Sequence, residues 1–535
     1  MDALFASYAR EVRHPAPDEV CGPQGVRPLY AGLARTLARL GTEELARRRS
    51  ALDVLFRDRG VTFSLFGEER PFPLDVVPRV LEAAEWRAVE AGVAQRVRAL
   101  EAFLADVYGP QQVLRDHVVP RRLVLGSAHF ARAAHGWDPP GGVRVHVSGS
   151  DLVRGADGAL RVLEDNLRVP SGVSYVLENR RAMVRVAPEM FVGHRVRPVA
   201  DYAERLLSAL RAVAPTGVTD PTVAVLTPGV HNSAYFEHTL LARLMGVELV
   251  EGRDIAVRGT QVVMRTTAGE RPVHVLYRRL DDDYLDPLAF RADSLLGVPG
   301  LMTAARAGRV TLANAVGNGV ADDKLLYTYV PDLVRYHLGE EPLLGQVDTY
   351  RLGEGDQLEQ ALDRLDELVV KPVDASGGKG VVICADASPA ELDAVRATLR
   401  AAPREWIAQE LVQLSTSPTV VDGRLAPRHV DLRPFAVHDG RDVWVLPGGL
   451  TRVALPEGGK VVNSSQGGGS KDTWVLADEP GARRVRTGPP RRRGGATVRG
   501  TEAGPHRAAA GAEVHAQQQQ QQQRDRPEPG RGPTC

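Results

Sequence analysis

The chain has 535 residues, 43% of them hydrophobic and 25% charged, which is typical of a soluble protein with two to four domains. Because 67 basic residues balance 67 acidic ones, no global charge recruits nucleic acid or an anionic membrane, and no apolar run is long enough to span one. Three scattered cysteines exclude a disulfide framework, and the first twenty residues do not resemble a signal peptide, so we expect a cytoplasmic protein with reduced thiols.

The first part of the chain predicts a helical start, a strand and a long helix. Residues 1–60 are predicted to be helical and irregular, because apolar residues recur at helical spacing from 29 to 55. Residues 61–66 alternate as a strand does. Residues 78–108 carry apolar side chains at helical spacing, which predicts one amphipathic helix.

The later parts predict alternating strands and helices. Residues 143–147 and 160–163 predict a hairpin around a Gly-Ala-Asp-Gly turn, and residues 221–250 predict a βαβ unit. Further elements are expected in chain order: a strand at 273–277, a helix at 321–338, antiparallel strands at 368–370 and 381–384, and strands at 406–412, 426–437 and 443–447. The predicted fold class is α/β (α+β).

Composition separates the chain into three regions. We place an N-terminal helical region at 1–60, a structured region at 61–477 (in parts 61–200, 201–320 and 321–477), and a tail at 478–535. The tail is rich in Pro, Gly and Arg and has no apolar periodicity, so we expect it to be disordered. Its arginines at 491–493 could contact nucleic acid or acidic partners. A solvated tail, functional or produced by a shifted reading frame, is the simpler interpretation.

The segment Val162-Leu163-Glu164-Asp165-Asn166 offers a carboxylate and an amide two residues apart on a predicted strand. Side chains at i and i+2 share a face, so Glu164 and Asn166 point the same way. In the predicted hairpin Asp151 lies on the neighbouring strand, and three such oxygen ligands suit Mg²⁺. A solvated strand face is the alternative for the Glu-x-Asn pair alone.

The strand Val369-Val370-Lys371-Pro372 leads into the glycine-rich segment 374–380. Glycines let backbone amides turn toward a phosphate, and Lys379 can add a charge. Lys371, at the end of an apolar strand, needs an anionic partner. Because a strand follows, and Gly380 stands where a Walker A loop has Ser or Thr, we predict a hairpin that covers a nucleotide. An ordinary hairpin turn is the alternative.

Other polar segments are candidates for substrate contacts. Arg168 can hold an acyl phosphate or a carboxylate, and Ser171 with Gly172 can open a helix whose N-terminal amides face an anion. Arg433 and Arg452 stand at strand ends, within reach of phosphates. We expect the Gly-rich segment 463–472 to be a site loop. The aspartates at 281–283 after Arg278 are either an acidic binding patch or a solvated loop.

Together these motifs resemble the circularly permuted ATP-grasp type 2 family, which is related to glutathionylspermidine synthase. The resemblance covers roughly residues 61–475 and rests on the stretches 162–172, 232–238, 277–283, 319–324, the lysine strand with its glycine loop, and 463–474. In ordinary ATP-grasp enzymes the Glu-x-Asn pair follows the nucleotide lysines. Here it precedes them, as the permuted family requires.

The resemblance implies an ATP-grasp core with a nucleotide site whose ligands can be assigned in groups. Lys324 and Lys371 would bind ATP phosphates, and the β- and γ-phosphates would be covered by Ser376, Gly377, Gly378, Lys379 and Gly380. The adenine and ribose pocket would be lined by Gln409, Glu410 and Val412. Mg²⁺ would be held by Asp151, Glu164 and Asn166. Arg433 and Arg452 would steady the transferring phosphate, and Arg168 with Ser171 would serve the acyl side.

The expected function is ATP- and Mg²⁺-dependent ligation of a small-molecule or peptide carboxylate to an amine through an acyl phosphate. A non-catalytic nucleotide-binding partner protein and a small-molecule phosphotransferase are the alternatives. Arg278, Asp281 and Asp282 are candidates for holding the amine. No nucleic acid or membrane partner is expected, a homo-oligomer is compatible with the sequence, and the identity of the substrates is left open.

Overall fold

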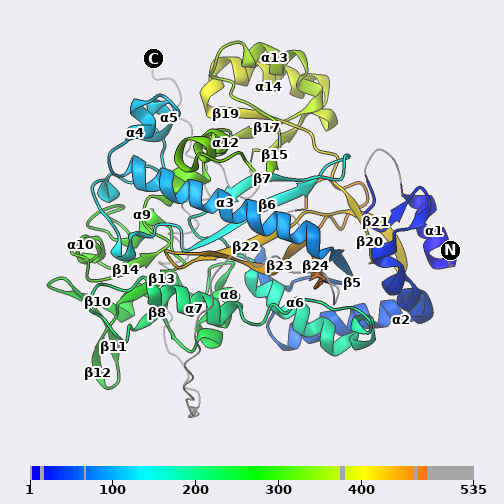
Figure 1. Cartoon of the computed structure of the whole chain (residues 1–535), viewed down its shortest axis with the longest axis horizontal. Helices are drawn as coiled ribbons and strands as arrows, with labels where there is room; N and C mark the ends of the chain where they lie inside the picture. Colours follow the sequence, from blue (N-terminus) through cyan, green and yellow to red (C-terminus); the bar gives the residue numbers. More distant parts are fainter. Residues whose placement is uncertain (1–2, 13–16, 66–67, 374–379, 463–467, 479–535) are drawn as a thin grey trace, which may run out of the picture.

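The computed structural model describes residues 3–12, 17–65, 68–373, 380–462 and 468–478, which surround a central sheet of seven strands (Figure 1). The strand order is β15 (Gly345–Gln346), β7 (Leu160–Asn166), β6 (Val147–Arg154), β22 (Arg433–His438), β23 (Val443–Val453), β24 (Gly469–Val475) and β5 (Leu74–Leu81). The two outer pairs are parallel, and the strands between them are antiparallel. The predicted hairpin is therefore confirmed as β6 and β7, although its first strand spans 147–154 and not the predicted 143–147.

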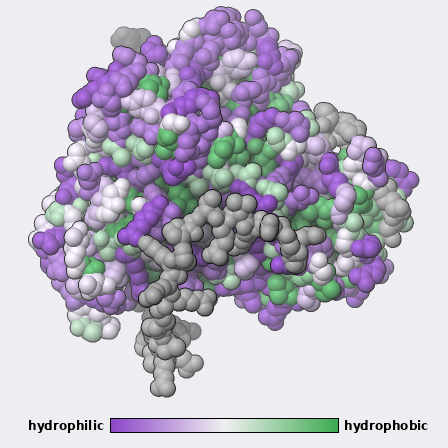
Figure 2. Space-filling model, viewed as in Figure 1, coloured by the Kyte–Doolittle hydropathy of each residue, from purple (hydrophilic) through white to green (hydrophobic). Residues whose placement is uncertain are grey.

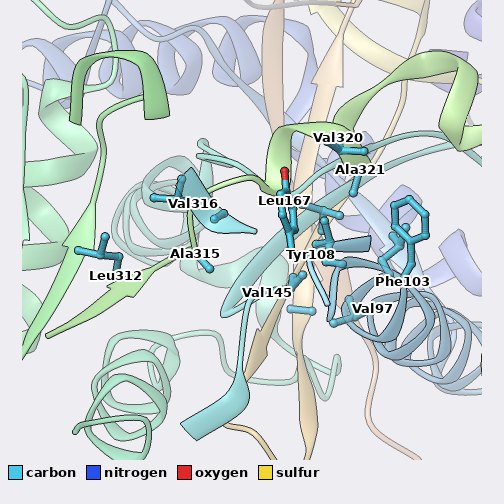
Figure 3. Close-up of a cluster of buried hydrophobic side chains, with 14 of the residues drawn as sticks. Val97, Phe103, Tyr108, Val145, Leu167, Leu312, Ala315, Val316, Val320 and Ala321 are labelled. Atoms are coloured by element: carbon cyan, nitrogen blue, oxygen red, sulfur yellow. The ribbon is translucent and has the colours of Figure 1, made fainter. Parts of the chain in front are cut away.

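Helices pack on both faces of this sheet and create two separate cores. Helix α3 (Ala83–Val107) contributes to one core and α6 (Val173–Val186) to the other. Along β22, Ala436 packs on the α3 side, whereas Phe435 and Val437 pack on the α6 side, as strand alternation requires. Figure 3 shows the α3-side core, which also contains Leu167. This core therefore anchors the segment that follows β7.

A second sheet is wholly parallel, in the order β14 (Thr311–Ala313), β13 (Val275–Arg278), β8 (Val223–Leu226) and β9 (Glu248–Val250). Helices α7 (Tyr202–Ala212), α8 (Tyr235–Met245) and α10 (Leu301–Arg306) belong to this part of the chain. A three-stranded antiparallel sheet follows β9, formed by β10 (Ile255–Arg258), β11 (Gln261–Thr266) and β12 (Gly269–Pro272). The predicted βαβ unit is confirmed as β8, α8 and β9.

A third, antiparallel sheet has its own small core. Its strand order is β16 (Thr349–Tyr350), β19 (Trp406–Glu410), β17 (Leu368–Pro372) and β18 (Val382–Ile383), with helices α13 (Gln357–Asp363) and α14 (Pro389–Ala401) beside it. Figure 2 shows mostly hydrophilic side chains over this upper part of the molecule. Leu368, Val370 and Ala408 belong to its core. Alternation therefore places Lys371 and Gln409 on the opposite face of the sheet.

The remaining elements lie mostly at the N-terminal side and around the site. They are α1 (Ala3–Glu11), α2 (Ala31–Asp58), α4 (Gln112–Arg115), α5 (Arg121–Leu125), α9 (Asp282–Leu285), α11 (Lys324–Tyr327), α12 (Val330–Leu333), and the pairs β1 (Cys21–Gly22) with β2 (Gly25–Val26), β3 (Thr62–Leu65) with β4 (Glu68–Pro71), and β20 (Thr416–Val421) with β21 (Arg424–His429). Among the described residues, no helix is both long and apolar enough to cross a bilayer.

Four predicted elements differ from the structure. The strand predicted at 426–437 is divided into β21, which ends at His429, and β22, which begins at Arg433. Residues 78–81 end strand β5, and the helix begins only at Ala83. Every residue of β5 is buried, and a fully buried strand lacks the alternation that separates it from a helix. The predicted helix at 321–338 is divided into α11, α12 and a π-helical turn. Residues 469–472, predicted as part of a site loop, instead begin strand β24. The predicted disorder of the tail concerns residues almost all outside the described part of the chain.

Candidate active site

A β-bulge in the β6–β7 hairpin turns the Glu-x-Asn pair toward the α6 side of the central sheet. Asp151 lies opposite Glu164, and the register shifts between this pair and the pair of Leu152 with Val162. The extra residue reverses the alternation, as bulges do. Asp165 consequently faces α3, where Arg96 Nε donates to its carboxylate oxygens at 2.9 and 2.8 Å. Glu164 and Asn166 are left on the face that carries Asp151.

A row of charged side chains crosses four neighbouring strands on this face. Glu164 stands on β7, Asp151 on β6, Arg433 on β22 and Arg452 on β23. Arg433 binds both oxygens of Asp151, with Nη2 at 2.9 Å from Oδ2. Arg452 Nη2 donates to the same Oδ2 at 2.6 Å. Asp151 thus lies between the two arginines that the sequence placed at strand ends.

The two predicted phosphate lysines face this row from the third sheet and from α11. Lys371 Nζ donates to Gln409 Oε1, and Gln409 Nε2 donates to Thr349 Oγ1 at 3.0 Å. Burial lowers the pKa of Lys371 to about 8, although the negative charge of Glu164 raises it. Burial and the charge of Asp151 raise the pKa of Glu164, against an opposing effect of Arg433 and both lysines. The charges of Glu164, Lys324 and Lys371 are therefore close enough to influence one another.

The oxygen atoms of this hairpin fit a divalent cation. The Glu164 side chain is 36% exposed, and its nearest arginine nitrogen is 3.9 Å away. Asp151 accepts three N–H donors, whereas a carboxylate has about four acceptor positions. The buried Asn166 Nδ2 has no hydrogen-bond partner in the described part of the chain, but it is a donor, so only the amide oxygen of Asn166 can hold a cation. Those residues contain no cluster of three or more His, Cys, Asp or Glu side chains arranged for a metal, so a cation here would take two carboxylates and an amide.

The segment after β7 is held by carboxylates of the chain itself. Arg168 Nε donates to Asp322 Oδ2 at 2.8 Å, and the Leu167 amide donates to Asp322 Oδ1 at 2.6 Å. Arg433 Nη1 donates to the Ser171 carbonyl at 3.2 Å. The Ser171 carbonyl therefore meets the charged row, whereas Arg168 pairs with Asp322 and lies 3.9 Å from Asp281.

The predicted anion site at the start of α6 is occupied by Glu237 of α8. Glu237 Oε2 accepts the amides of Gly172 at 2.7 Å and of Ser174 at 3.0 Å, and also the Ser174 hydroxyl. Its other oxygen is 2.9 Å from Nη2 of buried Arg279. These amides face an anion as expected, but the anion is a side chain and not a ligand.

Of the residues predicted to hold the amine, Arg278 has a structural role, and the aspartates line a small cavity. Arg278 is buried, and its guanidinium donates to the carbonyls of Asn314, Leu280 and Ala315 and pairs with Asp282. Its donors are used within the chain, so it is not arranged to hold a substrate. A cavity of about 140 Å³ beside it is lined by Arg168, the aspartates 281–283, Phe130 and Phe290, among other residues.

The other predicted site residues lie around the third sheet or outside the described residues. Gly380 follows the glycine segment with φ of 70°, while Ser376 to Lys379 fall outside the described ranges. Glu410 ends β19 and pairs with Arg364 at 2.9 Å, and Val412 follows it. Sequence reasoning missed the roles of Asp322, Glu237 and Asp431. Only the role of Asp431 could have been predicted from the sequence, because residues two positions apart in an extended segment share a face and Asp431 stands two positions before Arg433.

Comparisons with known proteins give one matching family and several relatives. The family described as circularly permuted ATP-grasp type 2 matches residues 78–454. An uncharacterized protein of Mycobacterium tuberculosis (strain ATCC 25618 / H37Rv) is 61% identical over 483 residues, covering 90% of this chain and 88% of that protein. A Frankia casuarinae protein named "Putative glutamate--cysteine ligase 2-2" is 49% identical over 466 residues, covering 86% of this chain but 53% of that protein.

The solved structure of a glutathione synthetase-like effector from Globodera pallida has a related fold. It superposes with a TM-score of 0.55 at 11% identity and covers 81% of this chain and 98% of that one. At this identity the similarity concerns the fold alone.

Proposed function

The chain belongs to the circularly permuted ATP-grasp type 2 family, and from that premise we propose that it is an ATP-dependent ligase that joins a carboxylate to an amine. The observation that carries the proposal is the meeting of the Glu164–Asp151–Arg433–Arg452 row with Lys324 and Lys371. Four cationic side chains here face three carboxylates, Asp431 included, so the site favours an anion such as a nucleotide phosphate. The ligase name of the Frankia relative supports ligation, although this chain spans about half of that protein.

In the proposed reaction an oxygen of the substrate carboxylate attacks the γ-phosphorus of ATP, and ADP leaves. The nitrogen of the amine then attacks the acyl carbon of the acyl phosphate, inorganic phosphate leaves, and the amine loses a proton. No side-chain nucleophile is required, because positioning and charge neutralisation supply the catalysis.

Each group of residues has a role in this proposal. Lys324 and Lys371 bind phosphates, residues 376–380 cover the β- and γ-phosphates, and the base and ribose lie against Gln409, Glu410 and Val412. Arg433 and Arg452 contact the transferring phosphate, while Arg168 and Ser171 serve the acyl side. Asp151, Glu164 and Asn166 would hold Mg²⁺, which when bound neutralises phosphate charge.

Measurement of ADP release against a panel of carboxylates, with and without amines, tests the proposal. ADP release that requires both substrates supports a ligase. ADP release with one substrate and a stable phosphorylated product would establish a phosphotransferase instead. Tight ATP binding without turnover would establish a non-catalytic nucleotide-binding protein.

A further inference from the structure

Arg452 is held at the site by a carboxylate outside the predicted set of ligands. The Asp431 side chain is fully buried, and its two oxygens accept Arg452 Nε at 3.0 and 2.9 Å. Arg452 Nη2 also donates to Asp431 and, at 2.6 Å, to Asp151. A guanidinium has five N–H donors. The two on Nη1 have no acceptor among the described residues, and Nη1 is not one of the buried unpartnered atoms.

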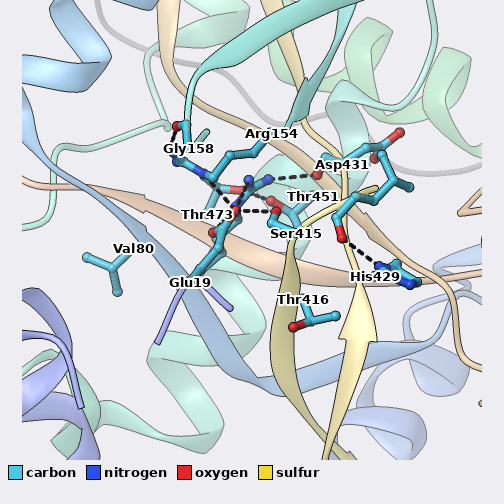
Figure 4. A network of polar contacts seen from close by, with 12 residues as sticks. Glu19, Val80, Arg154, Gly158, Ser415, Thr416, His429, Asp431, Thr451 and Thr473 are labelled. Atoms are coloured by element: carbon cyan, nitrogen blue, oxygen red, sulfur yellow. Dashed lines mark hydrogen bonds and ion pairs between the residues drawn. The ribbon is translucent and has the colours of Figure 1, made fainter. Parts of the chain in front are cut away.

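The backbone of Asp431 is itself fixed by hydrogen bonds. Its carbonyl accepts Nη1 of Arg79 at 2.8 Å, and its amide donates to the Arg452 carbonyl at 3.2 Å. Arg79 is fully buried and pairs with Glu19 at 2.5 Å. Figure 4 shows Asp431 at the border of the polar network around Glu19 and Arg154. The Asp431 carboxylate therefore has little freedom to move. The Arg452 guanidinium, which it binds on one side, is restricted as well.

We propose that Asp431 is a positioning residue that orients Arg452 so that Nη1 meets the transferring phosphate. This inference rests on the proposed function. A free arginine side chain loses roughly 2 kcal/mol of rotamer entropy when it is fixed. The hydrogen bonds to both oxygens of Asp431 fix the Arg452 side chain before the nucleotide binds. Asp151 cannot replace these bonds, because Arg433 already engages both of its oxygens.

The experiment uses the full chain and MgADP with aluminium fluoride, which imitates the transferring phosphoryl group. The parent protein should bind MgADP more tightly when fluoroaluminate is present. In Asp431→Asn the gain in affinity that fluoroaluminate causes should be smaller by about tenfold or more. The affinity of this variant for MgADP alone should change by less than about threefold. Asp431→Asn added to Arg452→Ala should cause no further loss, because a positioning residue acts only through its partner.

Four results would each contradict either the proposed function or the positioning role of Asp431. If the parent shows no gain with fluoroaluminate, phosphoryl transfer at this site is wrong, and the proposed function fails with it. If the parent gains affinity and Asp431→Asn keeps the full gain, or if the losses of the two variants add, the positioning role is wrong. Should Asp431→Asn not fold, Asp431→Glu keeps the charge but shifts it by one methylene group, and an undiminished gain in that variant overturns the inference.

Discussion

Two clusters of arginine and carboxylate groups on the central sheet differ in whether their polar atoms have partners among the described residues. In the closed cluster, Glu19 accepts Arg79 at 2.7 and 2.5 Å, Arg154 at 3.0 Å and Ser415 Oγ at 2.7 Å (Figure 4). In the open cluster, the row from Glu164 to Arg452, Nη1 of Arg452 has no acceptor among the described residues, and the Glu164 side chain is 36% exposed. The two clusters are joined where Arg79 binds the Asp431 carbonyl.

The pKa values of the two glutamates express this difference. Burial alone would raise the pKa of Glu19, but Arg79 and Arg154 lower it to about 2. The pKa of Glu164 is raised by burial and by Asp151, because its positive neighbours are too distant to compensate. In a closed cluster the buried charges satisfy one another, so removal of one partner leaves an uncompensated charge and destabilises the fold. An open cluster retains unsatisfied charge, which a ligand can neutralise.

The largest expected effect is on activity in the open cluster. Glu164→Ala should abolish Mg²⁺-dependent ADP release, because it removes the carboxylate that is most available to the cation. The partly exposed side chain is 3.9 Å from Arg433, which is a long ion pair, so the melting temperature should stay near that of the parent. Full ADP release by this variant would show that the site assignment is wrong.

The closed cluster should respond in the opposite way. Glu19→Gln leaves two buried arginines without their charged partner and should cost about 3–5 kcal/mol of unfolding free energy. Denaturant unfolding measures this loss. ADP release per folded molecule should change little, and a selective loss of turnover without destabilisation would remove the distinction between the clusters.

Acid should destabilise the closed cluster by a similar mechanism. The folded pKa of Glu19, about 2, is below its ordinary value of 4.5, so its stabilisation is complete above pH 4.5 and is lost as the pH falls toward 2. By linkage this amounts to about 3 kcal/mol. Between pH 4.5 and pH 2 the unfolding free energy of the parent should fall more steeply with decreasing pH than that of Glu19→Gln. Parallel pH dependences would contradict the assignment.

A smaller effect is expected where the parallel sheet joins the site. Glu237→Gln weakens the charged bonds to Arg279 and to the start of α6, which should cost about 1.5–3 kcal/mol. Hydrogen exchange of the Gly172 and Ser174 amides should become faster. Unchanged protection of both amides would show that Glu237 does not hold this segment.

The smallest effect is expected for an exposed pair used as a control. Arg258 and Glu270 lie 2.5 Å apart on β10 and β12, with side chains 53% and 39% exposed. Arg258→Ala should change the unfolding free energy by less than about 0.5 kcal/mol. A loss as large as that of Glu19→Gln would mean that burial does not explain the difference between the clusters.

Local sequence determined much of the candidate site. Glu164, Asn166 and Lys371 were found because each stands in a short strand with a recognisable flank, and strand alternation fixes which side chains share a face. The order of the metal and lysine motifs, together with their similarity to the permuted family, was enough to predict the fold class, which the family match confirms. The internal boundaries at 200 and 320 stay predictions.

Only the tertiary structure decided which charges meet. The bulge at Leu163, between Val162 and Glu164, depends on the pairing with β6, and the contact of Asp431 with Arg452 joins the segment before β22 to β23. Glu237 occupies the helix start that the sequence offered to a ligand, because α8 packs beside α6. Such contacts join residues 20 to 300 positions apart, and no local pattern encodes them, since they depend on how separate strands and helices pack together.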